Sequence, residues 1–161
     1  MTRAVIAFGA NLGDREATIV AATRELAETG GVEVTAVSPL YETPAIKDAG
    51  VDHEAPRYLN GVILVDTTLE PHALLTVLQA IEQRHGRERA EHWGDRTLDL
   101  DLIDVDGTEL ADERLVLPHP RAAERAFVLQ PWLDVEPGAV LPGHGPIAAL
   151  RGAAADEVVR R

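Results

Sequence analysis

Hydrophobic positions recur along this chain with two different periods, which predict strands and helices in alternation. Residues 32–37 (Val-Glu-Val-Thr-Ala-Val) alternate between apolar and polar, as a strand with one buried face does. Residues 69–85 instead carry an apolar stripe at helical spacing, made by Ala73, Leu74, Val77, Leu78 and Ile81. The same criteria predict strands at 5–8, 32–37, 58–65 and 98–105, and helices at 15–28 and 69–85.

Glycine and proline residues separate these elements. Gly30-Gly31 ends the first helix, and Pro71 suits the first turn of the second. The remaining segments are expected to form a flexible loop at 45–57, a turn at Asp106-Gly107, a small strand at 115–117, a short helix at 122–129, an irregular tail and a last helix near 153–160. The order β-α-β-β-α-β predicts an α+β, ferredoxin-like core, an antiparallel sheet with helices packed on it and a C-terminal extension, in one domain over residues 1–161.

Composition and charge narrow the class of protein. The 161 residues include 45% hydrophobic positions, which suits one domain with a core, and there is no cysteine. The 27 acidic residues outnumber 15 Lys+Arg, and the net charge of −12 argues against non-specific nucleic-acid binding. No stretch approaches the ~20 apolar residues of a membrane span, and the apolar run at the start is too short for a signal peptide. We expect a cytoplasmic protein, monomeric by default, that binds neither nucleic acid nor membrane.

Residues 86–102 carry the most informative chemistry. Asp99 and Asp101 alternate with leucines, so on a strand they share one face, about 6.5–7 Å apart. Two carboxylates at that spacing suit Mg²⁺, which takes its other ligands from water and substrate phosphates. A basic cluster that can bind those phosphates lies just upstream, at Arg87, Arg89, His92 and Arg96. The combination predicts phosphoryl transfer from a nucleotide.

Each part of this pattern alone also has a plainer interpretation. An alternating Leu/Asp strand is commonly half-buried with a solvated outer face, and an arginine-rich loop is commonly solvated surface. By the same criteria Tyr58 and Phe127 would be core residues, and Asn60 a turn residue. The acidic pair beside the arginine cluster, in so acidic a chain, favours a functional site.

Five sequence blocks together are specific. They are residues 8–14 (Phe-Gly-Ala-Asn-Leu-Gly-Asp), 38–44 (Ser-Pro-Leu-Tyr-Glu-Thr-Pro), 58–61 (Tyr-Leu-Asn-Gly), 86–102 (Gly-Arg-Glu-Arg at its start and Arg-Thr-Leu-Asp-Leu-Asp-Leu at its end) and 117–131 (Leu-Pro-His-Pro-Arg, then Arg-Ala-Phe-Val-Leu-Gln-Pro). In this order they resemble the 6-hydroxymethyl-7,8-dihydropterin pyrophosphokinase family of the folate pathway. The resemblance covers nearly the whole chain, and the fourth block is the most specific.

The resemblance implies an activity and a map of the site. Members transfer the pyrophosphoryl group of ATP to the hydroxymethyl group of the pterin and release AMP; Asp99 and Asp101 would hold two Mg²⁺ ions. The resemblance also implies that Arg87 and Arg96 clamp the phosphates and that Trp93 closes over the site. The implied pterin slot consists of Gly9, Thr43, Pro44, Tyr58, Asn60 and Phe127. The implied nucleotide contacts, besides the two arginines, are Glu82, His119 and Arg125.

Two other functions fit part of these features. A Mg²⁺-dependent nucleotide hydrolase or an ordinary kinase would use the same acids and arginines. A non-catalytic ferredoxin-like binding module would have no need for Asp99 and Asp101 beside the arginines. The residues of the pterin slot discriminate between the first alternative and pyrophosphoryl transfer, and loss of ATP binding on removal of the two aspartates would exclude the second.

Overall fold

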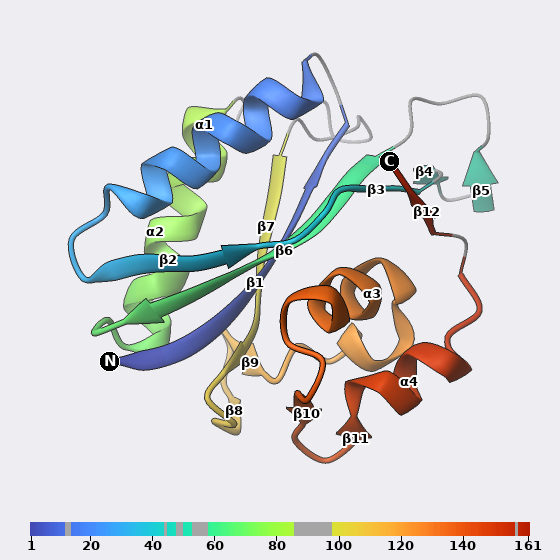
Figure 1. Cartoon of the computed structure of the whole chain (residues 1–161). Helices are drawn as coiled ribbons and strands as arrows, with labels where there is room; N and C mark the ends of the chain where they lie inside the picture. Colours follow the sequence, from blue (N-terminus) through green and yellow to red (C-terminus); the bar gives the residue numbers. More distant parts are fainter. Residues whose placement is uncertain (12–13, 44, 48–49, 53–57, 86–97, 157) are drawn as a thin grey trace.

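A computed structural model describes residues 1–11, 14–43, 45–47, 50–52, 58–85, 98–156 and 158–161. A six-stranded sheet runs through its centre (Figure 1). Its strands are β1 (Thr2–Ala10), β2 (Val32–Val37), β3 (Tyr41–Thr43), β6 (Tyr58–Thr67), β7 (Leu98–Val105) and β12 (Val159–Arg160). They lie in the order β12-β3-β6-β1-β7, with β2 also paired to β6, and all these pairs are antiparallel.

Helices cover both faces of the sheet. The helices α1 (Arg15–Ala27) and α2 (Pro71–Arg84) pack side by side on one face, and α3 (Ala126–Val135) lies on the other together with α4 (Ile147–Ala153) (Figure 1). The α1–α2 layer confirms the ferredoxin-like α+β prediction, and α3 and α4 form the C-terminal extension. None of the helices in the described parts of the chain has the length and apolar character needed to span a membrane.

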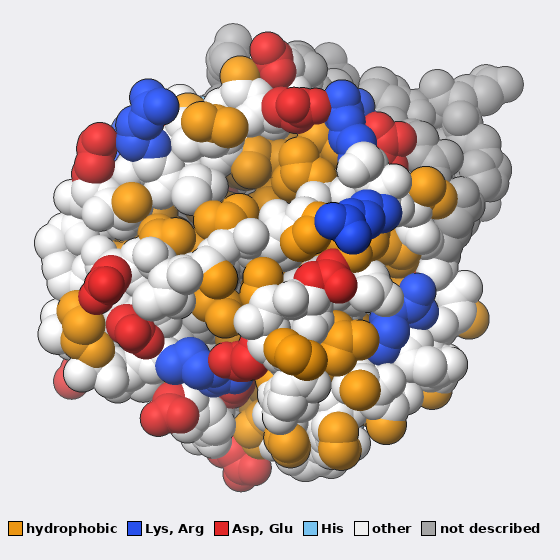
Figure 2. Space-filling model, viewed as in Figure 1, with side chains coloured by type: hydrophobic (Ala, Val, Ile, Leu, Met, Phe, Trp, Pro, Cys, Tyr) orange, Lys and Arg blue, Asp and Glu red, His pale blue; other side chains and the backbone are white. Residues whose placement is uncertain are grey.

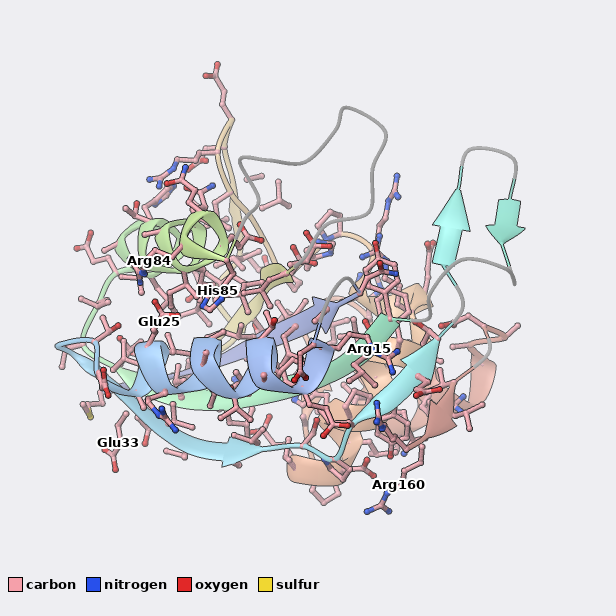
Figure 3. The ribbon with its side chains drawn as sticks, turned by 90° about the horizontal axis from the view of Figure 1, so that it is seen from above. Arg15, Glu25, Glu33, Arg84, His85 and Arg160 are labelled. Atoms are coloured by element: carbon pink, nitrogen blue, oxygen red, sulfur yellow. The ribbon has the colours of Figure 1, made fainter. Side chains whose placement is uncertain are left out.

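Local signals explain where the two long helices begin and how they are joined. The carboxylate of Asp14 accepts a hydrogen bond from the backbone N of Ala17 at 3.1 Å and caps α1, while Pro71 stands at the start of α2. At their other ends, Glu25 on α1 pairs with Arg84 at 2.5 Å and with His85 (Figure 3). The helix layer is therefore held by charge at its rim as well as by its apolar face.

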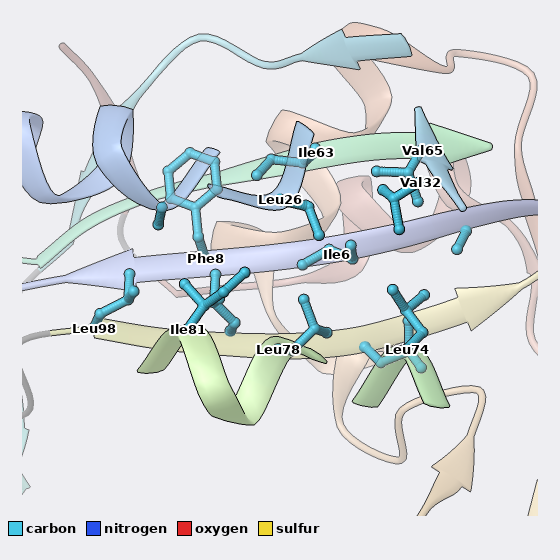
Figure 4. Close-up of a cluster of buried hydrophobic side chains, with 14 of the residues drawn as sticks. Ile6, Phe8, Leu26, Val32, Ile63, Val65, Leu74, Leu78, Ile81 and Leu98 are labelled. Atoms are coloured by element: carbon cyan, nitrogen blue, oxygen red, sulfur yellow. The ribbon is translucent and has the colours of Figure 1, made fainter. Parts of the chain in front are cut away.

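The larger core lies between the sheet and α1–α2 (Figure 4). Ile6 and Phe8 of β1 meet Leu78 and Ile81 of α2 there, as the helical stripe predicted, although Ala73 of that stripe is exposed. The ring of Phe8 lies over Gly61, which pairs with it on β6. A Cβ on that glycine would be 2.3 Å from Cζ of Phe8, so this packing requires glycine.

A second core lies between the opposite face of the sheet and α3. It includes Val5, Val62 and Leu64 from the strands, and the fully buried Trp132 of α3. The β1–β7 register shifts between Val5 and Ile6, and this bulge turns Ile103 toward the same core. Only part of this face is covered by the second core, and the remainder carries the polar residues described below.

Several segments differ from the sequence-based expectation. Strand β3 was not predicted, and the tail that was expected to be irregular contains a hairpin at 140–146 and helix α4. The 45–57 stretch, expected to be a flexible loop, contains a hairpin of β4 (Ala45–Lys47) and β5 (Gly50–Asp52). The helix expected near 153–160 is wrong: α4 ends at Ala153, and the chain then pairs with β3 as strand β12. The expected 122–129 helix is a 3₁₀ turn (Ala122–Glu124) followed by α3, which continues past Pro131. The remaining short strands form hairpins of β8 (Leu110–Ala111) with β9 (Val116–Leu117) and β10 (Val140–Leu141) with β11 (Gly145–Pro146).

Candidate active site

Three adjacent strands bring the predicted site residues together on the face opposite α1 and α2. The register pairs Gly9 of β1 with Asn60 of β6 on one side and with Asp99 of β7 on the other. Asp101 lies in the next row on the same face, opposite Ala7. Because directly paired residues share a face, Asn60, Gly9 and Asp99 form one row across the sheet. Residues from three segments that are far apart in the sequence thus meet at one end of this face.

The two aspartates share the face of β7 that is turned away from the α1–α2 core. Asp99 and Asp101 are half-buried, whereas Leu98, Leu100 and Leu102 are buried on the helix side, as the alternation predicted. No group of three or more His, Cys, Asp or Glu side chains suited to a metal occurs among the residues that the structure describes. A pair of carboxylates fits Mg²⁺, which completes its octahedron with water and substrate phosphates, better than an ion that requires a full protein cage.

The Asn60 side of the row is a buried, hydrogen-bonded amide packed closely against Gly9. The Asn60 side chain is 5% exposed, and its Nδ2 donates to Oγ1 of Thr43 on β3 at 2.7 Å. A Cβ on Gly9 would lie 3.0 Å from Oδ1 of Asn60 and 3.7 Å from Cδ1 of Tyr58. The absence of a side chain at Gly9 therefore allows close approach to an oriented amide and to the half-buried ring of Tyr58.

His119 and Arg125 bring a second set of groups to Asp101. The backbone N of His119 donates to the carbonyl of Ile103 at 2.8 Å, which fixes this residue against β7. Burial lowers the pKa of His119 from 6.5; the charge of Asp101 raises it, and the charges of Arg125 and Arg121 lower it further. Asp101, Arg121 and Arg125 therefore all lie within electrostatic reach of His119. Nδ1 of His119 accepts from the backbone N of Arg121 at 3.2 Å, so the neutral ring carries its proton on Nε2.

Phe127 is the second residue of α3, and Arg125 stands at the N-cap position of that helix. The guanidinium of Arg125 lies over the Phe127 ring, 5.4 Å from its centroid. The Phe127 ring is half-buried and packs against the core under α3. Two predicted contacts of different kinds, one for the nucleotide and one for the pterin, are thus held together at one helix end.

Glu82 reaches the same strand from the helix side. This α2 carboxylate is 3% exposed, and its Oε2 accepts a hydrogen bond from the backbone N of Leu100 at 2.8 Å. Leu100 stands between Asp99 and Asp101, on the strand at the edge of the sheet. Glu82 was predicted as a nucleotide contact; its bond to β7 gives it a second role, fixing the backbone that carries the acidic pair.

We expect Glu82→Ala to destabilise the fold and to slow turnover. The change leaves the N–H of Leu100 buried without this acceptor, which costs about 1–3 kcal/mol in the free energy of unfolding. Glu82→Gln keeps an oxygen acceptor and should lose less than half as much. Chemical denaturation and steady-state kinetics measure both effects. The exposed neighbour Gln83→Ala is the control, and a Glu82→Ala protein as stable as that control would contradict the assignment.

Tyr41 is a residue of this site that the sequence analysis did not single out. It extends the row, because β3 pairs it with Asn60, and its hydroxyl donates to the carboxylate of Asp134 on α3. Burial, together with Asp134, raises the pKa of Tyr41 to about 12, so the phenol keeps its proton at neutral pH. The sequence feature that could have identified Tyr41 was its position in the block at residues 38–44. Pro44, Arg87, Trp93 and Arg96 lie outside the described residues, and their roles stay predictions.

Comparisons with known proteins agree with this arrangement. The family model for 7,8-dihydro-6-hydroxymethylpterin-pyrophosphokinase (HPPK) matches residues 5–137. A protein of Methylorubrum extorquens named 2-amino-4-hydroxy-6-hydroxymethyldihydropteridine pyrophosphokinase is 43% identical over 150 residues, which are 93% of this chain and 92% of that protein. A Pseudomonas aeruginosa protein of the same name is 39% identical over 160 residues, 99% of this chain and 96% of its own.

Solved structures share the fold. A crystal structure of an HPPK-DHPS in complex with substrates matches 94% of this chain with a TM-score of 0.73 at 14% identity. A Plasmodium falciparum HPPK-DHPS with pterin and p-hydroxybenzoate matches 94% with a TM-score of 0.69 at 16% identity. This chain spans 43% and 42% of those two longer chains. The family match and the close relatives over nearly the full length lead to one conclusion: the chain belongs to the 7,8-dihydro-6-hydroxymethylpterin-pyrophosphokinase family.

Proposed function

We propose that this chain transfers the pyrophosphoryl group of ATP to the hydroxymethyl group of 6-hydroxymethyl-7,8-dihydropterin in folate biosynthesis. The observation that carries the proposal is the row Asn60–Gly9–Asp99, with Asp101 beside it on the same face. It places a buried amide, suited to the polar edge of a planar heterocycle, in one row with an acidic pair suited to Mg²⁺ and phosphates. An enzyme that joins a heterocycle to a triphosphate needs both at one place.

The reaction requires attack on the β-phosphorus of ATP. The hydroxymethyl oxygen forms a bond to that phosphorus, the bond to the oxygen bridging to the α-phosphate breaks, and AMP leaves while the hydroxyl gives up its proton. Asp99 and Asp101 are the residues proposed to hold Mg²⁺ at this point. When bound, the metal supplies positive charge that neutralises the phosphates and makes the attacking oxygen more acidic.

The nucleotide side of the site is assigned to His119 and Arg125. Neutral His119 offers an Nε2–H donor at a position fixed by its bond to Ile103. Arg125 adds a permanent positive charge with the planar geometry that matches phosphate oxygens. Arg87 and Arg96 are proposed to clamp the triphosphate from the segment between α2 and β7, as the family resemblance implies, and Trp93 to close over it.

The pterin side is assigned to the residues around Gly9. Asn60, oriented by Thr43, is proposed to bind the polar edge of the pterin, since an amide both donates and accepts. Tyr58 and Phe127 are proposed to stack on its two faces, with Pro44 and the backbone of Thr43 lining the slot. The absence of a side chain at Gly9 supports this placement, because a side chain there would press against the Asn60 amide.

Nucleotide analysis tests the proposal. The protein is incubated with ATP, Mg²⁺ and 6-hydroxymethyl-7,8-dihydropterin, and the products are separated by anion exchange. We expect AMP, formed in proportion to pterin consumed and only when pterin is present. ADP would indicate single-phosphate transfer or hydrolysis, and AMP without pterin would indicate a hydrolase; either result would overturn the proposal.

A further inference from the structure

The beginning of α3 is capped by a residue from the far end of the chain. Arg125, at the N-cap position, makes no side-chain capping bond. Instead the carboxylate of Asp156 accepts from the backbone N of Ala126 at 2.8 Å and of Phe127 at 3.3 Å. A carboxylate there satisfies two helix N–H groups and interacts favourably with the positive end of the helix. Asp156 lies beyond residues 5–137, the part matched by the family model.

The residues after Asp156 pair with β3, the strand next to Asn60. Strand β12 pairs Val159 with Glu42 and Arg160 with Tyr41, and the backbone N of Arg161 donates to the carbonyl of Leu40 at 2.9 Å (Figure 1). β3 also carries Thr43, the partner of Asn60. The C-terminal tail therefore connects the start of α3 with the strand that orients the amide.

We propose that Asp156 is a positioning residue for the pterin, which holds Phe127 at the slot through the first N–H groups of α3 while β12 holds β3, the strand next to Asn60. This inference rests on the proposed function. The Phe127 ring has little freedom of its own once its backbone is fixed, because it packs on the core and under the guanidinium of Arg125. Small movements of the helix start would shift the ring relative to Tyr58 and Asn60.

A matched control for this cap exists elsewhere in the chain. The carboxylate of Asp112 likewise accepts from two backbone N–H groups, those of Arg114 at 2.9 Å and Leu115 at 2.8 Å. It closes the turn between β8 and β9 and also pairs with His72 on α2, apart from the row around Gly9. Asp112→Ala removes the same kind of interaction without touching α3 or β3.

The experiment measures pterin binding and turnover for Asp156→Ala, Asp156→Asn and Asp112→Ala. Binding is measured by calorimetry with Mg²⁺ and α,β-methylene-ATP, which blocks cleavage of the α–β bond. We expect Asp156→Ala to raise the pterin Kd about tenfold and Asp156→Asn about threefold, with kcat at saturating pterin changed less than about threefold. Asp112→Ala should leave the Kd within about twofold, even if its unfolding midpoint falls.

A double-mutant cycle separates positioning from general stabilisation. If Asp156 acts through Phe127, then Asp156→Ala should change the pterin Kd less than about twofold in a Phe127→Ala background. The same tenfold change in both backgrounds, or no change in the wild-type background, would overturn the inference. If Asp156→Ala does not fold, Asp156→Asn is carried through the same cycle. A wild-type protein that binds no pterin would instead overturn the proposed function.

Discussion

Replacing either Asp99 or Asp101 by asparagine is expected to lower turnover by about three powers of ten, because each is assigned as a ligand of the catalytic magnesium. The fold should tolerate the change, since both side chains are half-buried on the face opposite the main core while the alternating leucines hold the strand. The measurement is the rate of AMP formation as a function of Mg²⁺ concentration. The loss should persist at saturating ATP and lessen only in part at high Mg²⁺.

The control for this prediction lies at the other end of the same strand. Asp106→Asn also removes one negative charge, in an exposed turn where the backbone φ of 41° suits asparagine. Its turnover should stay within about twofold of the wild type. If Asp99→Asn and Asp101→Asn behaved like Asp106→Asn in Mg²⁺, the metal assignment would be wrong.

Gly61→Ala is expected to destabilise the protein by about 3 kcal/mol, at the upper end of the usual cost of overpacking a core. The added methyl would lie 2.3 Å from Cζ and 2.9 Å from Cε2 of Phe8, and 2.8 Å from Oγ of Ser38. Phe8 is 3% exposed and cannot move aside without displacing its neighbours in the α1–α2 core. Denaturant unfolding measures the effect.

Two variants show whether this clash is the cause. Gly138→Ala adds a methyl group where no atom lies within 4 Å, and its unfolding free energy should change by less than about 0.5 kcal/mol. Phe8→Leu removes the ring atoms that the methyl meets, so Gly61→Ala should cost less in a Phe8→Leu background than alone. Equal costs in both backgrounds would refute the explanation.

The strand carrying the acidic pair was predictable because its pattern is local. Alternation along residues 98–102 determines which side chains share a face, whichever strand becomes the neighbour. The bulge at Ile103 and the row Asn60–Gly9–Asp99 depend on pairing with β1, a partner about 90 residues away in the sequence. Proximity of the acidic pair to Asn60 followed from the family resemblance and not from any spacing.

In the C-terminal tail, by contrast, contacts with the rest of the fold override the local sequence pattern. The alanine-rich composition after residue 152 favours a helix locally, yet residues 159 and 160 form a strand because β3 offers an unpaired edge in the folded protein. The carboxylate that caps α3 belongs to Asp156, which lies 30 residues after Ala126 and 29 after Phe127. This separation is too large for a local capping pattern to reveal it. Tertiary contacts decide such features.

On the face of the molecule seen in Figure 2, acidic and basic side chains of the described residues are interspersed, an arrangement that the net charge of −12 does not reveal.

The fate of the β-phosphate tests the account most directly. ATP labelled with ³²P at the β position is incubated with the protein, Mg²⁺ and 6-hydroxymethyl-7,8-dihydropterin, beside Asp99→Asn as the impaired variant. Pyrophosphoryl transfer predicts that the label moves from ATP to the pterin product, with unlabelled AMP released. Label retained in ADP, or released as free pyrophosphate while the pterin stays unmodified, would contradict it.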